Sequence, residues 1–196
     1  MTYISKEPDS DIHYFLTTLA VSLFLPPSPL PIFSYFRPAM ARIHLTTFIA
    51  APAEVVFDLS RHIGLHQLSM RQYGEEAIRG VRSGLIKAGE SVTWKAKHLG
   101  KVRYLTVKIT AMERPLFFED VMTEGDFLSF HHTHHFKQVK NGTLVIEELE
   151  FESPYGLLGQ LLNRFYLTLY MKRLLEQRNH TIREYAESKK WEALLR

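Results

Sequence analysis

One change of period divides the sequence into two kinds of structure. From Arg42 to Glu152, short runs alternate between apolar and polar residues, and glycine, proline or Asn-Gly separates most of these runs. Such alternation is typical of strands that bury one face. After Ser153 the apolar residues recur at helical spacing almost to the end of the chain. The pattern therefore predicts an antiparallel sheet followed by one long helix.

The boundaries of the expected strands follow from where each alternating run begins and ends. The first strand is expected at 42–50, with Ile43, Leu45 and Thr47 on one face. The spacing of apolar residues in AEVVFDLS and RHIGLHQLSM then predicts two short helices. The later strands are expected at 73–79, 90–98, 102–112, 117–123, 127–138 and 143–152.

The C-terminal helix is expected to span about thirty residues, which is long for a globular protein. Its apolar stripe would comprise Leu158, Leu161, Leu162, Phe165, Leu169 and Leu174, with Arg164, Lys172, Arg173 and Glu176 largely opposite. A bent sheet of this length buries one face only by wrapping around another element, and this helix is the only one large enough. The expected fold class is α+β, a curved antiparallel sheet of about six to seven strands around the C-terminal helix. This arrangement tends to leave a cavity between helix and sheet.

The chain of 196 residues, 45% of them apolar, is long enough for one substantial core. Residues 1–39 differ from the rest, because no charged residue lies between Asp11 and Arg37 and an apolar run ends at PPSPLP. That run is too short for a comfortable transmembrane helix. We expect an N-terminal extension at 1–39, loosely ordered or a mis-assigned start, and a ligand-binding domain at 40–196. A membrane-touching anchor is the alternative for the extension.

Charge and cysteine content exclude several classes of function. The net charge of +3 comes from basic residues mixed with acidic ones, which favours a solvated surface, so no nucleic-acid partner is expected. The absence of cysteine excludes disulfides, a thiolate nucleophile and cysteine-ligated metal, and a cytoplasmic protein fits best. Peripheral membrane contact is considered for the basic end of the long helix, and no obligate protein partner is expected. The basic residues there are Arg173, Arg178, Arg183, Lys189 and Lys190.

The stretch SFHHTHHF, residues 129–136, is the most informative chemical feature. On a strand, Phe130, His132, His134 and Phe136 share a face. The phenylalanines make this the buried face, so the two histidines between them are expected to point inward. His131 and His135 are expected to meet solvent.

The Asn141-Gly142 pair predicts the hairpin that joins this strand to the last one. A two-residue turn there places Phe136 opposite Glu147, His134 opposite Leu149 and His132 opposite Phe151. Glu147 would then lie diagonal to His134, within reach of its long side chain.

Parity on the other strands adds further groups to the cavity. Val92, Trp94, Ala96 and His98 are expected to point inward, and Asp120 joins them if Phe118 faces the core. Mostly apolar walls with a few convergent polar groups are typical of small-molecule sites. The expected ligand contacts are Trp94, His98, Asp120, Phe130, His132, His134, Phe136, Glu147, Leu149 and Phe151.

Two sharper chemistries are open for the same residues. His132 and His134, with His98 or Glu147 as a third ligand, could form a zinc site, but the rest of the pattern does not require an ion, so no metal or cofactor is expected. His134 and Glu147 are the candidates for acid/base catalysis. No residue is identified as a nucleophile.

Several segments also resemble a known superfamily. They are IAAPAEVVFDLSR, SGLIKAGESVTWKAKHLG, RPLFFEDVMTEGDFLSFHHTHHF and GTLVIEELEFESPYGLLG, followed by YMKRLLEQRN. From Ile43 to about Asn179 the chain resembles the START-like, helix-grip superfamily called SRPBCC. It is most similar to the bacterial polyketide cyclase/dehydrase or coenzyme Q-binding START-like branch, some members of which are called cell-division-inhibitor-like. The resemblance implies a helix-grip fold with a hydrophobic ligand cavity.

The resemblance does not choose among functions, because the superfamily contains binders, carriers and enzymes. The leading hypothesis is binding, with transport or presentation, of a small hydrophobic molecule such as a quinone, isoprenoid, lipid or polyketide. In that hypothesis His98, His132, His134 and Glu147 orient a polar head. The alternatives are a cyclase/dehydratase-type enzyme that uses a His/Glu pair, and a regulatory interaction module.

Overall fold

The computed structural model describes residues 40–153 and 166–195. The expected N-terminal extension at 1–39 therefore lies outside the described residues. So does the start of the expected C-terminal helix, including the named residues Leu158, Leu161, Leu162, Arg164 and Phe165.

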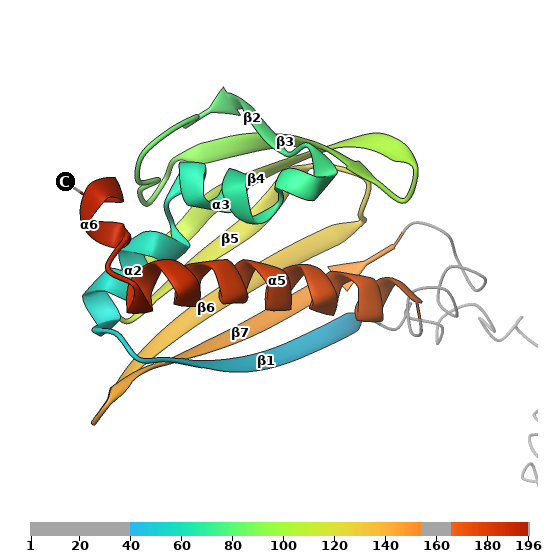
Figure 1. The fold of residues 1–196 in the computed structure, drawn as a ribbon. Coiled ribbons are helices and arrows are strands. Elements are labelled where there is room, and N and C mark those ends of the chain that lie inside the picture. Colours follow the sequence, from blue (N-terminus) through green and yellow to red (C-terminus); the bar gives the residue numbers. More distant parts are fainter. Residues whose placement is uncertain (1–39, 154–165, 196) are drawn as a thin grey trace, which may run out of the picture. The chain divides into compact units, whose positions relative to one another are not determined.

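A single antiparallel sheet of seven strands dominates the described domain, in the order β1-β7-β6-β5-β4-β3-β2 (Figure 1). The strands are β1 (Ala41–Ile49), β2 (Glu76–Gly80), β3 (Ser91–His98), β4 (Lys101–Glu113), β5 (Phe117–Glu124), β6 (Ser129–Val139) and β7 (Gly142–Glu152). Successive strands from β2 to β7 pair with their neighbours, and β1 is the edge strand beside β7. The expected α+β class is confirmed. Only the start of β2 differs clearly, because Arg71–Tyr73 form a 3-10 helix, η1.

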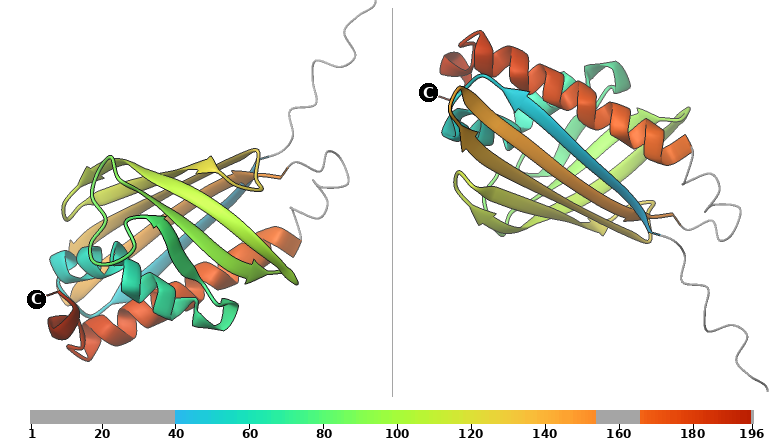
Figure 2. Two further views of the ribbon diagram at one scale, coloured as in Figure 1. Left: turned by 90° about the horizontal axis from the view of Figure 1, so that it is seen from above. Right: turned by 90° about the horizontal axis from the view of Figure 1, so that it is seen from below.

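The helices lie on one face of this sheet. Two short helices, α2 (Ala53–Ser60) and α3 (Ile63–Ser69), follow β1, as the apolar spacing predicts. The long helix α5 (Thr168–Glu187) runs across the concave face, and the short helix α6 (Trp191–Leu194) follows it (Figures 1 and 2). Figure 2 shows the strands curving around α5 in both views. This is the helix-grip arrangement.

Irregular pairing between strands accounts for part of the curvature. The register of β4 against β5 shifts between Thr106 and Val107 and again between Ile109 and Ala111. Such bulges bend a strand and increase its twist. The bent sheet presents a concave face with room for both helix and cavity.

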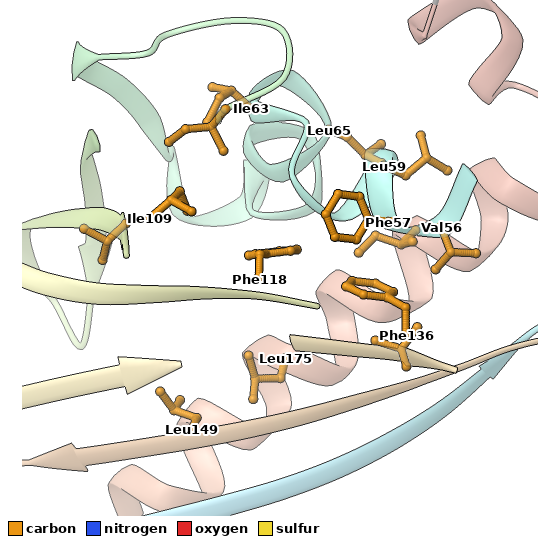
Figure 3. Packing of buried hydrophobic residues seen from close by; sticks show 14 of the residues in the cluster. Val56, Phe57, Leu59, Ile63, Leu65, Ile109, Phe118, Phe136, Leu149 and Leu175 are labelled. Carbon is orange, nitrogen blue, oxygen red and sulfur yellow. The ribbon is translucent and has the colours of Figure 1, made fainter. Parts of the chain in front are cut away.

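An aromatic cluster fixes α2 against the sheet. The ring of Phe57 packs edge-on against Phe118 and Phe136, with centroids 5.6 and 5.2 Å away (Figure 3). Phe57 has no exposed surface. Edge-to-face packing of this kind adds to the free energy that burial alone supplies. The cluster closes the α2 end of the core.

The buried face of α5 differs from the expected leucine stripe. Leu174 is buried as expected, but Leu169 is 50% exposed and lies on the outer face. The buried residues of α5 are Leu174, Leu175, Arg178, Asn179, Ile182 and Ala186. The stripe therefore contains a charged and an amide side chain that an apolar pattern does not mark.

The hairpin between β6 and β7 is shifted by two residues from the expected register. Val139 pairs with Gly142, so the turn is Lys140-Asn141, and Glu147 lies directly opposite His134. The expected turn at Asn141-Gly142 is wrong because Gly142 belongs to the strand. A Cβ at this position would lie 2.2 Å from the carbonyl oxygen of Ile49, so glycine is needed for the close approach of β1. A shift of two keeps every side chain on its expected face.

A buried carboxylate ties α2 to the β4–β5 connection. Asp58 accepts hydrogen bonds from Arg61 Nη2 and from Arg114 Nη2, both at 2.7 Å. Burial alone would raise the pKa of Asp58, but the hydrogen bonds and charges of Arg114 and Arg61 outweigh it and lower that pKa. A carboxylate whose pKa is lower in the folded state stabilises the fold when it is ionised.

Replacing Asp58 tests this linkage. Asp58→Asn is expected to reduce the free energy of unfolding at neutral pH by about 2 kcal/mol, because two arginines lose a charged acceptor. The deficit should persist down to about pH 4, where an unfolded aspartate titrates, and then shrink as the pH falls through the lower pKa of the folded state. Urea unfolding across this pH range measures it. Glu54→Gln, on the exposed face of α2, should show no such change, and an equal change in both variants would contradict the assignment.

Candidate ligand-binding cavity

A cavity of about 280 Å³ lies between the concave face of the sheet, α3 and α5. Its walls are mostly apolar and include Val92, Trp94, Val107, Ile109, Phe130 and Leu175. The lining reaches the surface at Leu99 and Tyr104, which are 43% and 53% exposed. The cavity therefore opens near the β3–β4 turn.

Most of the expected ligand contacts line this cavity. They are Trp94, His98, Asp120, Phe130, His132, His134 and Leu149. Phe136, Glu147 and Phe151 do not, which corrects their expected position. Phe136 packs against Phe57, Phe151 packs against Phe127 with ring centroids 5.5 Å apart, and Glu147 has no exposed surface. These three side chains support the cavity from behind, while ligand binding by the other seven stays a prediction.

His134 lies between two carboxylates. Its Nε2 is 3.0 Å from Asp120 Oδ2 and its Nδ1 is 3.2 Å from Glu147 Oε1. The register explains this placement, since β6 puts His134 opposite Phe118 on one side and opposite Glu147 on the other. The Phe118 ring also stacks on His134 at a centroid distance of 4.1 Å. Because an ionised carboxylate only accepts hydrogen bonds, His134 Nε2 is the donor in its bond to Asp120. Arg178 Nη1 also lies 3.5 Å from His134 Nδ1.

Two side chains from α5 hold Glu147 in place. Arg178 Nη1 donates to Glu147 Oε1 at 2.9 Å, and Asn179 Nδ2 donates to Glu147 Oε2 at 2.5 Å. Arg178 also donates to the backbone oxygen of Ser60, and Asn179 donates to Thr47. The network thus joins β7, β1, α2 and α5 at one buried point.

The charges of this network shift the pKa values of its members. Burial alone would raise the pKa of Glu147, but the His134 hydrogen bond and the Arg178 charge lower it to about 2. Burial alone would likewise raise the pKa of Asp120, and the His134 hydrogen bond with the neighbouring positive charges lowers it. Burial lowers the pKa of His132 to about 3. At neutral pH the two carboxylates are therefore ionised and His132 is neutral.

Of the network residues that line the cavity, His132 has unused hydrogen-bonding capacity. It lines the cavity and is 5% exposed, yet its buried Nε2 has no hydrogen-bond partner. Its ring lies 3.8 Å from that of His134. His134 is satisfied within the protein, so His132 is the better candidate to meet a polar group of a ligand.

A second polar cluster lies near the opening. His98 Nδ1 is 2.7 Å from the Tyr170 hydroxyl, and His98 Nε2 is 4.0 Å from Glu75. Glu75 also lies 2.7 Å from His66, whose ring stacks on Trp94. Burial raises the pKa of Tyr170 to about 12. Because His98 contacts Tyr170 and Glu75, it is not part of a metal-ligand group with His132 and His134. The residues whose potential ligand atoms all lie within 4.8 Å of one another are Asp120, His132 and His134.

Sequence reasoning missed the contributions of α5 and of Glu75, which lies between η1 and β2. The sequence analysis places Arg178 at the basic surface of the helix and gives Asn179 no role in the site. Both follow buried leucines by four residues, and this spacing places them on the buried face. An inward-facing Glu147 also needs a buried cation as its partner, and Arg178 on the buried face of α5 meets this requirement. Glu75 and Tyr170 have no comparable signal.

The basic end of α5 differs from the surface considered for membrane contact. Arg178 is 6% exposed and bonded to Glu147, and Lys190 Nζ lies 2.6 Å from Glu184. Arg183 donates to the backbone oxygen of Phe48. Among the described residues, no helix is long and apolar enough to cross a membrane.

Sheet, gripped helix and internal cavity together define the helix-grip fold of the START-like, SRPBCC proteins, as the sequence resemblance implies. No family model and no curated protein matches the chain in sequence.

Proteins of known structure do resemble this chain in fold. The protein TTHA0849 from Thermus thermophilus is 20% identical with a TM-score of 0.59, over 72% of this chain and 97% of that chain. A START superfamily protein from Mycobacterium smegmatis is 12% identical with a TM-score of 0.58, over 75% and 97%. The ZhuI aromatase/cyclase from Streptomyces sp. R1128 is 13% identical with a TM-score of 0.61, over 76% and 94%. At these identities the similarities establish the fold.

The buried network makes a prediction about stability. Glu147→Gln keeps the size of the side chain but leaves the buried Arg178 without its charged partner. The free energy of unfolding is expected to fall by about 3–5 kcal/mol, measured by urea unfolding. Glu148→Gln is the matched control, since Glu148 is adjacent and its side chain is 57% exposed. It should change stability by less than about 0.5 kcal/mol. Equal effects in the two variants would show that Glu147 is not the anchor.

Proposed function

We propose that the protein binds a compact hydrophobic molecule with one polar end. The observation that carries the proposal is a mostly apolar cavity with His132 in its wall. The Nε2 of this imidazole lies 3.6 Å from Glu147, and its Nδ1, 4.0 Å from Asp120, makes no hydrogen bond within the described residues. Apolar walls supply affinity in proportion to the area they remove from water. An unpartnered polar group in the wall favours a ligand that satisfies it.

Size narrows the class of ligand. The volume of about 280 Å³ lies near the lower limit of about 300–1,000 Å³ for small-molecule pockets. This favours a single-chain or fused-ring molecule, such as a short-chain quinone, a small isoprenoid or an aromatic polyketide, over a lipid with two acyl chains. Transport or presentation of that molecule would follow from reversible binding through the opening at Leu99 and Tyr104.

Two matched probes separate the apolar and polar contributions. 1-Naphthol and 1-methylnaphthalene have nearly the same shape and differ by a hydroxyl against a methyl group. His132→Leu is expected to weaken 1-naphthol about tenfold, the cost of one hydrogen bond, and to leave 1-methylnaphthalene within about twofold. Ala96→Phe, which fills the cavity from β3, is expected to weaken both probes at least about tenfold. Displacement of 1-anilinonaphthalene-8-sulfonate fluorescence measures both affinities.

The controls use outward-facing neighbours on the same strands. Lys97→Phe and His131→Leu should leave both affinities unchanged, because Lys97 is exposed and the side chain of His131 is 43% exposed. Circular dichroism confirms that each variant is folded. Equal weakening by Ala96→Phe and Lys97→Phe would exclude the cavity as the binding site, and equal loss of both probes in His132→Leu would remove the polar role of His132.

The contact between His134 and Asp120 favours a second candidate function. A carboxylate and an imidazole 3.0 Å apart at the wall of a largely apolar cavity form a pair suited to moving protons to and from a bound ketone. A cyclase/dehydratase-type enzyme would use this pair to enolise its substrate. ZhuI, an aromatase/cyclase, has the same fold.

Proton exchange tests the enzymatic alternative without a known substrate. If the pair acts as a base, the α-protons of 1-tetralone should exchange with deuterated water faster in the presence of the protein, as followed by NMR. Asp120→Asn should reduce that acceleration at least about a hundredfold, within the usual contribution of a general base. Exchange no faster than in buffer, or equal in Asp120→Asn and wild type, would leave binding as the function.

A further inference from the structure

Three potential metal ligands meet on two neighbouring strands in the wall of the cavity. Asp120 on β5 pairs directly with His132 on β6, and His134 follows two residues later on the same face. Asp120 Oδ2 lies 3.0 Å from His134 Nε2 and 4.0 Å from His132 Nδ1. All three ligand atoms lie within 4.8 Å of one another, so small side-chain rotations bring them to a common ion.

We propose that Asp120, His132 and His134 form a binding site for one divalent metal ion, Zn²⁺ or a cation of similar preference. Two imidazoles and one carboxylate are a ligand set found in catalytic zinc sites, in which the fourth position stays open. Imidazole ligands favour zinc and other late first-row ions over magnesium or calcium. All three side chains line the cavity, so the open position faces its contents.

The far nitrogens of both histidines support this assignment. His134 Nδ1 lies 3.2 Å and His132 Nε2 lies 3.6 Å from the same oxygen, Glu147 Oε1. Metal-ligating histidines usually donate their second N–H to a carboxylate, which fixes the tautomer and the orientation of the ring. Glu147 contacts the far nitrogens of His132 and His134, and Asp120 lies on the side where both rings would bind the ion. This matches that arrangement.

Glu147 is held rigidly enough to serve as the outer carboxylate. Arg178 and Asn179 occupy its two oxygens, and it has no exposed surface. Because these contacts fix the Glu147 side chain, they also fix the direction from which it approaches both rings. The geometry is therefore set before an ion arrives.

His132 provides an independent observation. Its ring is buried, and Nε2 has no hydrogen-bond partner in the described part of the chain. Burying an imidazole without satisfying it costs free energy. Ligation through Nδ1 would fix the proton on Nε2 and direct it toward Glu147, which accounts for a polar group that is otherwise unsatisfied.

The charge of the cluster is consistent with an added cation. Asp120 and Glu147 supply two negative charges, and Arg178 supplies one permanent positive charge nearby. The cluster therefore carries more negative than permanent positive charge, and a divalent cation would offset the excess. A bound ion would also ligate an oxygen of a hydroxyl, enolate or carboxylate in the cavity, so the polar end of the ligand would be an oxygen donor.

The test uses the full chain without a histidine tag, stripped of metal with EDTA and then titrated with Co²⁺. The expected result is one cobalt per chain with the intense visible absorption of a four- or five-coordinate site, displaced by Zn²⁺ at one equivalent. Asp120→Asn and His132→Ala should each weaken Co²⁺ binding at least about tenfold. His131→Ala and His135→Ala, on the outward face of the same strand, should bind within about twofold of wild type.

The opposite pattern would overturn the proposal. Absence of the visible absorption, or binding that survives Asp120→Asn but is lost in the His131→Ala, His135→Ala double variant, would assign the metal to surface histidines. Thermal unfolding of each apo variant distinguishes loss of ligands from loss of fold. Because the probe is the metal alone, its failure leaves binding of hydrophobic ligands untouched.

Discussion

The buried pair of Glu147 and Arg178 is the interaction on which the rest of the structure depends. It joins the last strand of the sheet to the helix that the sheet encloses, at 2.9 Å and with neither partner exposed to solvent beyond a small fraction. A buried ion pair of this kind adds little net stability, because desolvation offsets attraction. Its effect is geometric. Any rotation or sliding of α5 that separated the two charges would leave both unpaired in the core, so only one position of the helix is compatible with the fold.

Because Glu147 is anchored in this way, the two inward-facing histidines have different roles. His134 is held on both sides by carboxylates and stacks on Phe118, so it belongs to the scaffold as much as to the cavity. His132 shares its face but keeps an unpartnered nitrogen. Two neighbouring residues of the same type thus differ in what they offer a ligand, because only one of them lies level with Glu147 across the hairpin.

Much of this fold could be predicted from alternation alone, because parity along a strand survives errors of register. The phenylalanines around His132 and His134 sufficed to turn both inward, although the hairpin register was wrong by two. Its error had a physical source that no local pattern carries, namely the close approach of β1 to Gly142. The inward face of α5 was missed for a related reason. Arg178 was assigned to solvent on its charge, and only the distant Glu147 makes it a core residue.

The position of β1 has a kinetic consequence. Among the described residues β1 pairs with β7 alone, so residues such as Ala41 and Phe151 must meet across most of that part of the chain. Contacts this distant in sequence slow folding, because loop-closure entropy is lost before they form. Arg178 and Asn179 come later still in the chain. During synthesis, β1 can therefore pair only after all seven described strands have left the ribosome, and α5 covers the cavity later still. Until α5 docks, the face that later encloses a ligand is an open apolar surface, so a nascent domain that lacks α5 is prone to aggregation.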